Sequence, residues 1–278
     1  MLLTCFKHDF KALSRILVPV LICIGAAAVL GFCDTLIVFG EKPYDIMSGN
    51  LIGGMLSASA IGGLIVIAML LAAAVTVMMV LIFVRFYRSM VTDEAYLTFT
   101  LPVSAGTLIA SKFLASLVWM LIGSAAICAA GLVILTGVAL ADADFTFGEA
   151  MRAVWDLMRE VFSSEPLVIS LGCLYAVASA VRSYFQITAA ILFGASIVRK
   201  NKALAAVGMV LGVNFIMNTV LSVIGVSALL PRLYLDALGT SGMGVESWLI
   251  IQSGVNILLA AVFWWLNVHI AKKSVNIE

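Results

Sequence analysis

Long apolar runs separated by short polar segments dominate this sequence. Six runs carry almost no charge, and their apolar residues are continuous rather than alternating with polar ones. A bilayer core about 30 Å thick needs roughly 20 apolar residues per helix, and only helices or closed barrels satisfy their backbone groups in lipid. Because the runs do not alternate, we expect six membrane-spanning helices. Their expected ranges are 16–39, 51–84, 113–141, 167–198, 203–230 and 248–270.

Composition supports the same class. The 278 residues are 63% hydrophobic and only 11% charged, with a mean hydropathy of +1.17. A water-soluble surface needs far more charge. We therefore expect an all-α polytopic membrane protein in which residues 1–278 form a single transmembrane domain. The five cysteines form no CxxC pair, which favours apolar packing over a metal or redox site.

Basic residues predict the orientation of the spans. Lysine and arginine stay on the cytoplasmic side during insertion. With a cytoplasmic N-terminus, eleven of the sixteen basic residues fall on the inside. They are Lys7, Lys11, Arg15, Arg85, Arg88, Lys112, Arg199, Lys200, Lys202, Lys272 and Lys273. We therefore expect both termini in the cytoplasm. The net charge of +1 gives no indication of nucleic-acid binding.

The N-terminal segment, residues 1–15, has helical periodicity of its own. Its apolar residues recur at steps of three and four: Leu3, Phe6, Phe10, Leu13 and Leu17. Basic residues lie between them, as in an amphipathic helix on the cytoplasmic leaflet. The alternative is the basic start of the first span, and Pro19 would bend the junction between the two. A cleaved signal is disfavoured, because a charged stretch of fifteen residues precedes the apolar run.

The segment 142–166, between the third and fourth spans, shows a similar stripe. Its apolar positions are Phe147, Met151, Val154, Trp155, Met158, Val161 and Phe162. Charged residues fill the positions between them. We expect a short interfacial helix on the outer side. It would act as a structural cap or as a lid that contacts substrate.

The polar segment 85–112, between the second and third spans, predicts a further short helix. Thr92 is a suitable N-cap, and the acidic residues Asp93 and Glu94 complement the positive helix end. Pro102 ends the helix, because the residue before a proline avoids helical geometry. Ser104 would then cap the helix that enters the third span.

The stretches RFYRSMVTDEAYLTFTLPVSAGTLIASKFLASLVW and FKHDFKALSRILVPV resemble the permease subunits of type 2 ABC exporters, particularly those of Gram-positive bacteria. The resemblance implies a multi-pass protein of the bacterial cell membrane with six spans and cytoplasmic termini. It also implies a permease dimer, with itself or with a paralogue, that binds two copies of a separate ABC ATPase. ATP and Mg²⁺ would be bound by that partner, and this chain would bind no cofactor.

The resemblance also implies roles for particular residues. The coupling helix that docks on the ATPase would contain Asp93, Glu94, Tyr96, Leu97, Phe99, Leu101 and Pro102. The connecting helix beside the ATPase would contain Phe6, Lys7, Asp9, Phe10 and Lys11. The alternative for the coupling segment is that its acids only cap a helix while its aromatic residues lie among lipid headgroups.

The chain has no sequence motif for ATP hydrolysis or metal catalysis. A P-loop requires a Gly-Lys pair, and no lysine here follows a glycine. His8 and His269 lie near the two chain ends, and no HExxH motif occurs. We therefore expect a non-catalytic subunit. The alternatives are an ATP-independent secondary transporter or channel and, less favoured, a polytopic membrane enzyme.

Arg182 is the one basic residue inside a predicted span. A cation there costs several kcal/mol, on the order of 3 or more, unless it finds a partner or reaches water. It would either line the substrate path or form a structural pair, for example with Asp34. Asn214 and other amide side chains in the spans are expected to join helices. Small residues including Gly123, Gly208 and Gly212 are expected to allow close helix crossings.

The function that the resemblance implies is export of a hydrophobic or amphipathic molecule, such as a peptide, lipid or drug, powered by the separate ATPase. The permease would supply the path and the selectivity.

Overall fold

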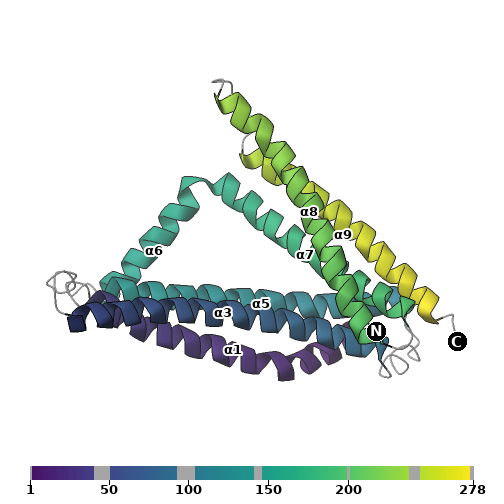
Figure 1. The fold of residues 1–278 in the computed structure, drawn as a ribbon, viewed down its shortest axis with the longest axis horizontal. Helices are drawn as coiled ribbons and strands as arrows, with labels where there is room; N and C mark the ends of the chain where they lie inside the picture. Colours follow the sequence, from purple (N-terminus) through teal and green to yellow (C-terminus); the bar gives the residue numbers. More distant parts are fainter. Residues whose placement is uncertain are drawn as a thin grey trace. The chain divides into compact units, whose positions relative to one another are not determined.

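The computed structural model describes residues 2–40, 51–92, 104–140, 146–198, 201–237 and 245–275. Within these ranges the chain forms seven α-helices (Figure 1). They are α1 (Leu2–Gly40), α3 (Leu51–Val91), α5 (Ala105–Leu140), α6 (Phe147–Ser164), α7 (Pro166–Ile197), α8 (Lys202–Ala237) and α9 (Val245–Val275). All except α6 are long and apolar enough to cross a membrane. The chain is a polytopic membrane protein with six candidate spans, and the predicted fold class is confirmed.

Five of the six long helices exceed their predicted spans, and α7 has the predicted length. They contain 31 to 41 residues, which at 1.5 Å per residue is longer than the roughly 30 Å hydrocarbon core. Each helix therefore tilts or extends beyond the lipid. α1 is continuous from Leu2 to Gly40 and contains Pro19. The N-terminal segment is thus helical as expected, and the same helix continues into the first span.

The chain divides into two compact units, which we describe separately. Unit 2 consists of Lys7–Ile82 and Ala115–Ser164. Its core packs Ile24 and Ala28 of α1 against Ala130 of α5, with Leu71 and Ala74 of α3 beside them. The small side chains of Ala28, Ala74 and Ala130 let the helices approach closely.

Glycines mark the tightest crossings in unit 2. A Cβ at Gly31 of α1 would lie 2.9 Å from Ile134 of α5, and a Cβ at Gly123 of α5 would overlap Met78 of α3. The expected close crossing at Gly123 is therefore confirmed. In contrast, no atom of the described chain lies within 4 Å of a Cβ built at Gly208 or Gly212. The expected crossings at these two glycines are not made within the described chain.

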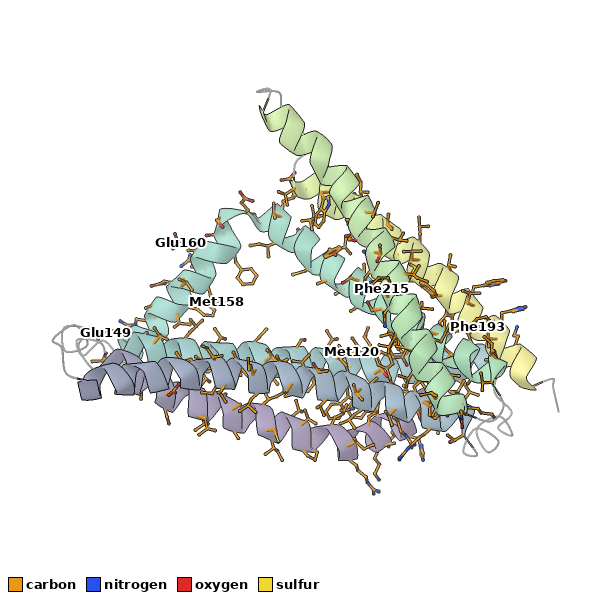
Figure 2. The ribbon with its side chains drawn as sticks, in the orientation of Figure 1. Met120, Glu149, Met158, Glu160, Phe193 and Phe215 are labelled. Atoms are coloured by element: carbon orange, nitrogen blue, oxygen red, sulfur yellow. The ribbon has the colours of Figure 1, made fainter. Side chains whose placement is uncertain are left out.

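Unit 1 consists of Met1–Phe6, Phe83–Leu114 and Glu165–Glu278. Within it α7 packs along both α8 and α9 (Figure 1). The tightest point is Gly194 of α7, where a Cβ would lie 2.7 Å from the carbonyl oxygen of Ala205 on α8. Apolar side chains on the outer faces stay exposed, as lipid contact requires. Phe215 of α8 is one of them, with 75% of its surface exposed (Figure 2).

The amphipathic helix predicted for segment 142–166 is present as α6, Phe147–Ser164. Four side chains of the predicted apolar stripe are exposed, Phe147, Met151, Trp155 and Phe162, and so is Leu157 outside the stripe. Charged residues, including Glu149 and Glu160, occupy positions between the apolar ones. Figure 2 shows these two acids and Met158 of the apolar stripe on α6. The separation of apolar from charged positions is that of an interfacial helix.

The first turn of α6 is held by a side-chain cap. The Glu149 carboxylate accepts hydrogen bonds from the backbone N–H of Thr146 at 2.8 Å and from its hydroxyl at 2.7 Å. This is the acidic half of a capping box. The hydroxyl and then the backbone N–H of Thr146 hold the pKa of Glu149 below its usual value.

We predict that Glu149→Gln frays the start of α6 at neutral pH. Because the folded-state pKa is lowered, the stabilisation exists above the unfolded-state pKa and is lost as the pH falls through the folded value. Hydrogen exchange of residues 147–150 should be several-fold faster in the variant at neutral pH. The difference should shrink as the pH falls below about 4, near the ordinary carboxyl pKa, and disappear only below the lowered pKa of Glu149. Glu160→Gln, in the last part of the helix, is the control, and equal exchange at neutral pH in all three proteins would contradict the prediction.

Candidate functional site

The two helix ends that flank the predicted coupling segment are capped. At the end of α3 the Thr92 hydroxyl donates to the carbonyl oxygen of Arg88. At the start of α5 the Ser104 hydroxyl accepts from the backbone N–H of Thr107 at 3.3 Å. The prediction that Ser104 caps the following helix is confirmed. The predicted coupling residues Asp93, Glu94, Tyr96, Leu97, Phe99, Leu101 and Pro102 lie outside the described residues.

An aromatic cluster joins these helix ends to the rest of unit 1. We use this name for six residues: Phe83 and Phe86 of α3, Phe113 of α5, Tyr184 and Phe185 of α7, and Trp264 of α9. Ring centroids of neighbouring members lie between 4.6 and 6.4 Å apart. These are the separations of attractive aromatic pairs. The cluster therefore fixes α3 and α5, close to the coupling segment, against α7 and α9.

Tyr184 is the centre of the aromatic cluster. Its ring contacts Phe83, Phe86, Phe113 and Phe185, and only 1% of its surface is exposed. Sequence reasoning missed this cluster. The aromatic residues are visible in the sequence, but the two members of a pair are separated by as many as 101 positions, as in Phe83 and Tyr184, and no local period connects them.

The predicted connecting-helix residues lie in the first turns of α1. Phe10 stacks on Trp119 of α5, with ring centroids 5.3 Å apart. Leu13 and Leu17, which continue the stripe, are buried, whereas Lys7 and Lys11 are exposed. Phe6 and Asp9 also make contacts within the protein. The apolar stripe thus packs partly against the protein itself, and the basic side chains remain accessible.

Arg182 lies inside unit 1 in a group of neutral polar side chains. Only 7% of its surface is exposed. Its guanidinium donates to the side-chain oxygens of Gln186 and Ser183, both on α7. The Gln186 amide in turn donates to Asn214 Oδ1 on α8 at 2.8 Å. We call Arg182, Gln186 and Asn214 the polar cluster. Within the described chain, Nε of Arg182 has no hydrogen-bond partner.

The predicted alternative partner of Arg182, Asp34, lies in unit 2 on α1. Its carboxylate rests against α3 at Gly63, where a Cβ would be 2.6 Å from Oδ2. Oδ2 is buried and has no hydrogen-bond partner within the described chain. Because the two units are described separately, a pair between Asp34 and Arg182 stays a prediction.

The expectation that amide side chains join helices is confirmed in unit 1. Asn214 links α8 to α7 through Gln186. Asn267 of α9, fully buried, donates from Nδ2 to the backbone carbonyl of Phe185 on α7 at 2.9 Å.

The cysteines are free thiols. In the described ranges, no three His, Cys, Asp or Glu residues form a group that could hold a metal ion.

No protein-family model matches the sequence, and comparisons with curated proteins and with solved structures likewise give no significant match. Functional conclusions therefore depend on the residues and geometry described above.

Proposed function

We propose that this six-span membrane protein is the permease subunit of an ATP-driven ABC exporter. The observation that carries the proposal is the aromatic cluster, which packs the helix ends beside residues 92–104 against α7 and α9. A force applied to this short segment by a docked partner reaches two further spans through buried rings. Such a contact suits a protein whose energy source is a separate subunit.

The remaining parts of the proposal follow from the sequence. Asp93 and Glu94 dock on the ATPase, and the basic face of α1 at Lys7 and Lys11 lies beside it. Two ATPase copies hold ATP and Mg²⁺ and serve a dimer of permeases in the bacterial cell membrane. Both termini lie in the cytoplasm, and the apolar face of α6 lies in the outer lipid interface. The cargo is a hydrophobic or amphipathic molecule.

A second candidate is an ATP-independent secondary transporter or channel. The observation in its favour is that one acid, Asp34, and one basic residue, Arg182, lie inside the spans predicted from the sequence. Such residues often mark ion or substrate pathways. Flux in vesicles that contain this chain alone, driven by an ion gradient and indifferent to ATP, would favour this candidate over the permease.

The test of the permease proposal is affinity purification from the native membrane in mild detergent. The expected result is co-purification of a protein with ABC ATPase motifs, whose ATP hydrolysis responds to the permease. The amount of ATPase recovered with the double variant D93K/E94K should be at least about tenfold lower than with the wild type, because lysines replace the two docking acids. The matched control D156K/E160K reverses two acids on α6 and should recover the wild-type amount. Absence of any ATPase from the wild-type sample, or equal recovery with both double variants, contradicts the proposal.

A further inference from the structure

The polar cluster contains a permanent positive charge without an opposite charge in the predicted spans 167–198 and 203–230 that carry it. A guanidinium stays protonated in proteins. Its hydrogen-bond partners, Gln186 and Ser183, are neutral, and so is Asn214, to which Gln186 donates. The predicted spans 167–198, 203–230 and 248–270 contain no aspartate or glutamate. A buried cation with only neutral partners is costly in a membrane, and a negative group beside it would lower that cost.

The packing of α7 on α8 extends the polar cluster along one line. Gly194 lies against Ala205 and Ala206, and Gln186 binds Asn214, so the two helices run antiparallel. One turn before Gln186 is Arg182, and one turn after Asn214 is Asn218. The register therefore places Asn218 on α8 at the level of Arg182. Asn218 is exposed, in a span whose other exposed residues are mostly apolar.

Two sources of negative charge inside the protein are poor matches. Asp34 is the one acid within a predicted span, and its carboxylate is enclosed against Gly63 of α3 in unit 2. A second copy of the chain would bring the same single acid in the same enclosed position. A ligand is left as the source, and a molecule in the membrane that carries one anionic group on an apolar body fits the surroundings of the polar cluster.

We propose that Arg182, Gln186 and Asn214 form an intramembrane binding site for the anionic headgroup of an amphiphile, with carboxylate or phosphate oxygens as the recognised groups. The guanidinium supplies the charge and its free Nε–H a donor, and such charge-assisted hydrogen bonds are the strong ones. Asn214 supplies a further amide to the site, and the helix register places Asn218 at the level of Arg182. This inference rests on the proposed function in one respect, because it names the class of cargo that the exporter would carry.

The test is equilibrium binding to the purified full-length chain in detergent at pH 8. Three radiolabelled probes share one apolar body: oleate, oleyl phosphate and the uncharged oleamide. At least one anionic probe should bind about tenfold or more tightly than oleamide, and the better of the two assigns carboxylate or phosphate. Arg182→Gln should bring this ratio to about one, since the charge is lost, whereas Arg182→Lys should keep most of it. Arg159→Gln, on α6, is the matched control and should keep the wild-type ratio.

A second variant covers the case in which Arg182→Gln does not fold. Asn214→Leu keeps the charge but removes a polar group from the site, and it should lower the ratio about threefold. Equal binding of all probes to the wild type overturns the proposal, and so does a wild-type ratio in a monodisperse Arg182→Gln or Asn214→Leu protein. The binding assay contains no ATPase, so its result does not depend on the permease proposal. If binding depends on Arg182 but no ATPase co-purifies from the native membrane, this site is supported and the permease proposal is contradicted.

Discussion

Replacing Gly194 with leucine should destabilise the protein by at least about 3 kcal/mol, at or beyond the upper end of the cost of overpacking. A Cβ at this position would lie 2.7 Å from the carbonyl oxygen of Ala205 and 2.9 Å from the Cα of Ala206. Both atoms belong to the backbone of α8, so no side-chain rotation can relieve the overlap. α7 and α8 must move apart. The measurement is the temperature at which half of the detergent-purified protein loses its monodisperse peak in size-exclusion chromatography.

The matched control for Gly194 is Gly212→Leu on α8. A Cβ at Gly212 meets no atom of the described chain within 4 Å, so a leucine there adds an apolar group where space is available. Its transition temperature should equal that of the wild type. If the Gly194→Leu protein had the same transition temperature as the wild type, the close approach of α7 and α8 would not be present in the protein in solution.

Tyr184→Ala should cost about 3–5 kcal/mol, the range for removing a large buried aromatic side chain. The ring contacts Phe83 and Phe86 of α3 and Phe113 of α5, and the residue is 1% exposed. Its removal leaves a cavity between helices, and the neighbouring rings lose their dispersion contacts. The same thermal measurement applies. Where an ATPase co-purifies, its stimulation by the permease should fall more than its recovery, because docking is kept while the packed connection is lost.

Tyr184→Phe separates the ring from the hydroxyl. It keeps the aromatic contacts and should therefore lose much less stability than the alanine variant. If the two variants were equally destabilised, the aromatic packing assigned to the centre of the cluster would be wrong.

The sequence was most informative where the signal was local. Continuous apolar runs of span length predicted the six long helices, the three- and four-residue spacing of apolar side chains predicted α6, and Ser104 was recognisable as a cap three residues before Thr107. Each of these features depends on neighbours within a few turns of one helix. The helix ends were less accurate: α3, for example, continues to Val91 rather than ending with the predicted span at residue 84.

Close helix crossings were predicted poorly, because a glycine in the sequence does not indicate whether another helix packs against it. Gly123 does pack against Met78, but Gly208 and Gly212 are open in the described chain, and Gly63 and Gly194 were not selected. The difference depends on which face of each helix meets another helix. In a span that is apolar all round, the hydrophobic pattern does not indicate that face.

By itself the sequence determined that this chain lies in a membrane as helices, because the length and continuity of its apolar runs leave the backbone no other way to satisfy its hydrogen bonds in lipid. It also identified Arg182 as a cation inside a membrane span, where a charge without a partner is energetically costly. Only the tertiary structure decided what surrounds that charge and which rings meet at Tyr184. These contacts join residues on different helices, and their geometry is set by packing between spans rather than by the order of residues within one.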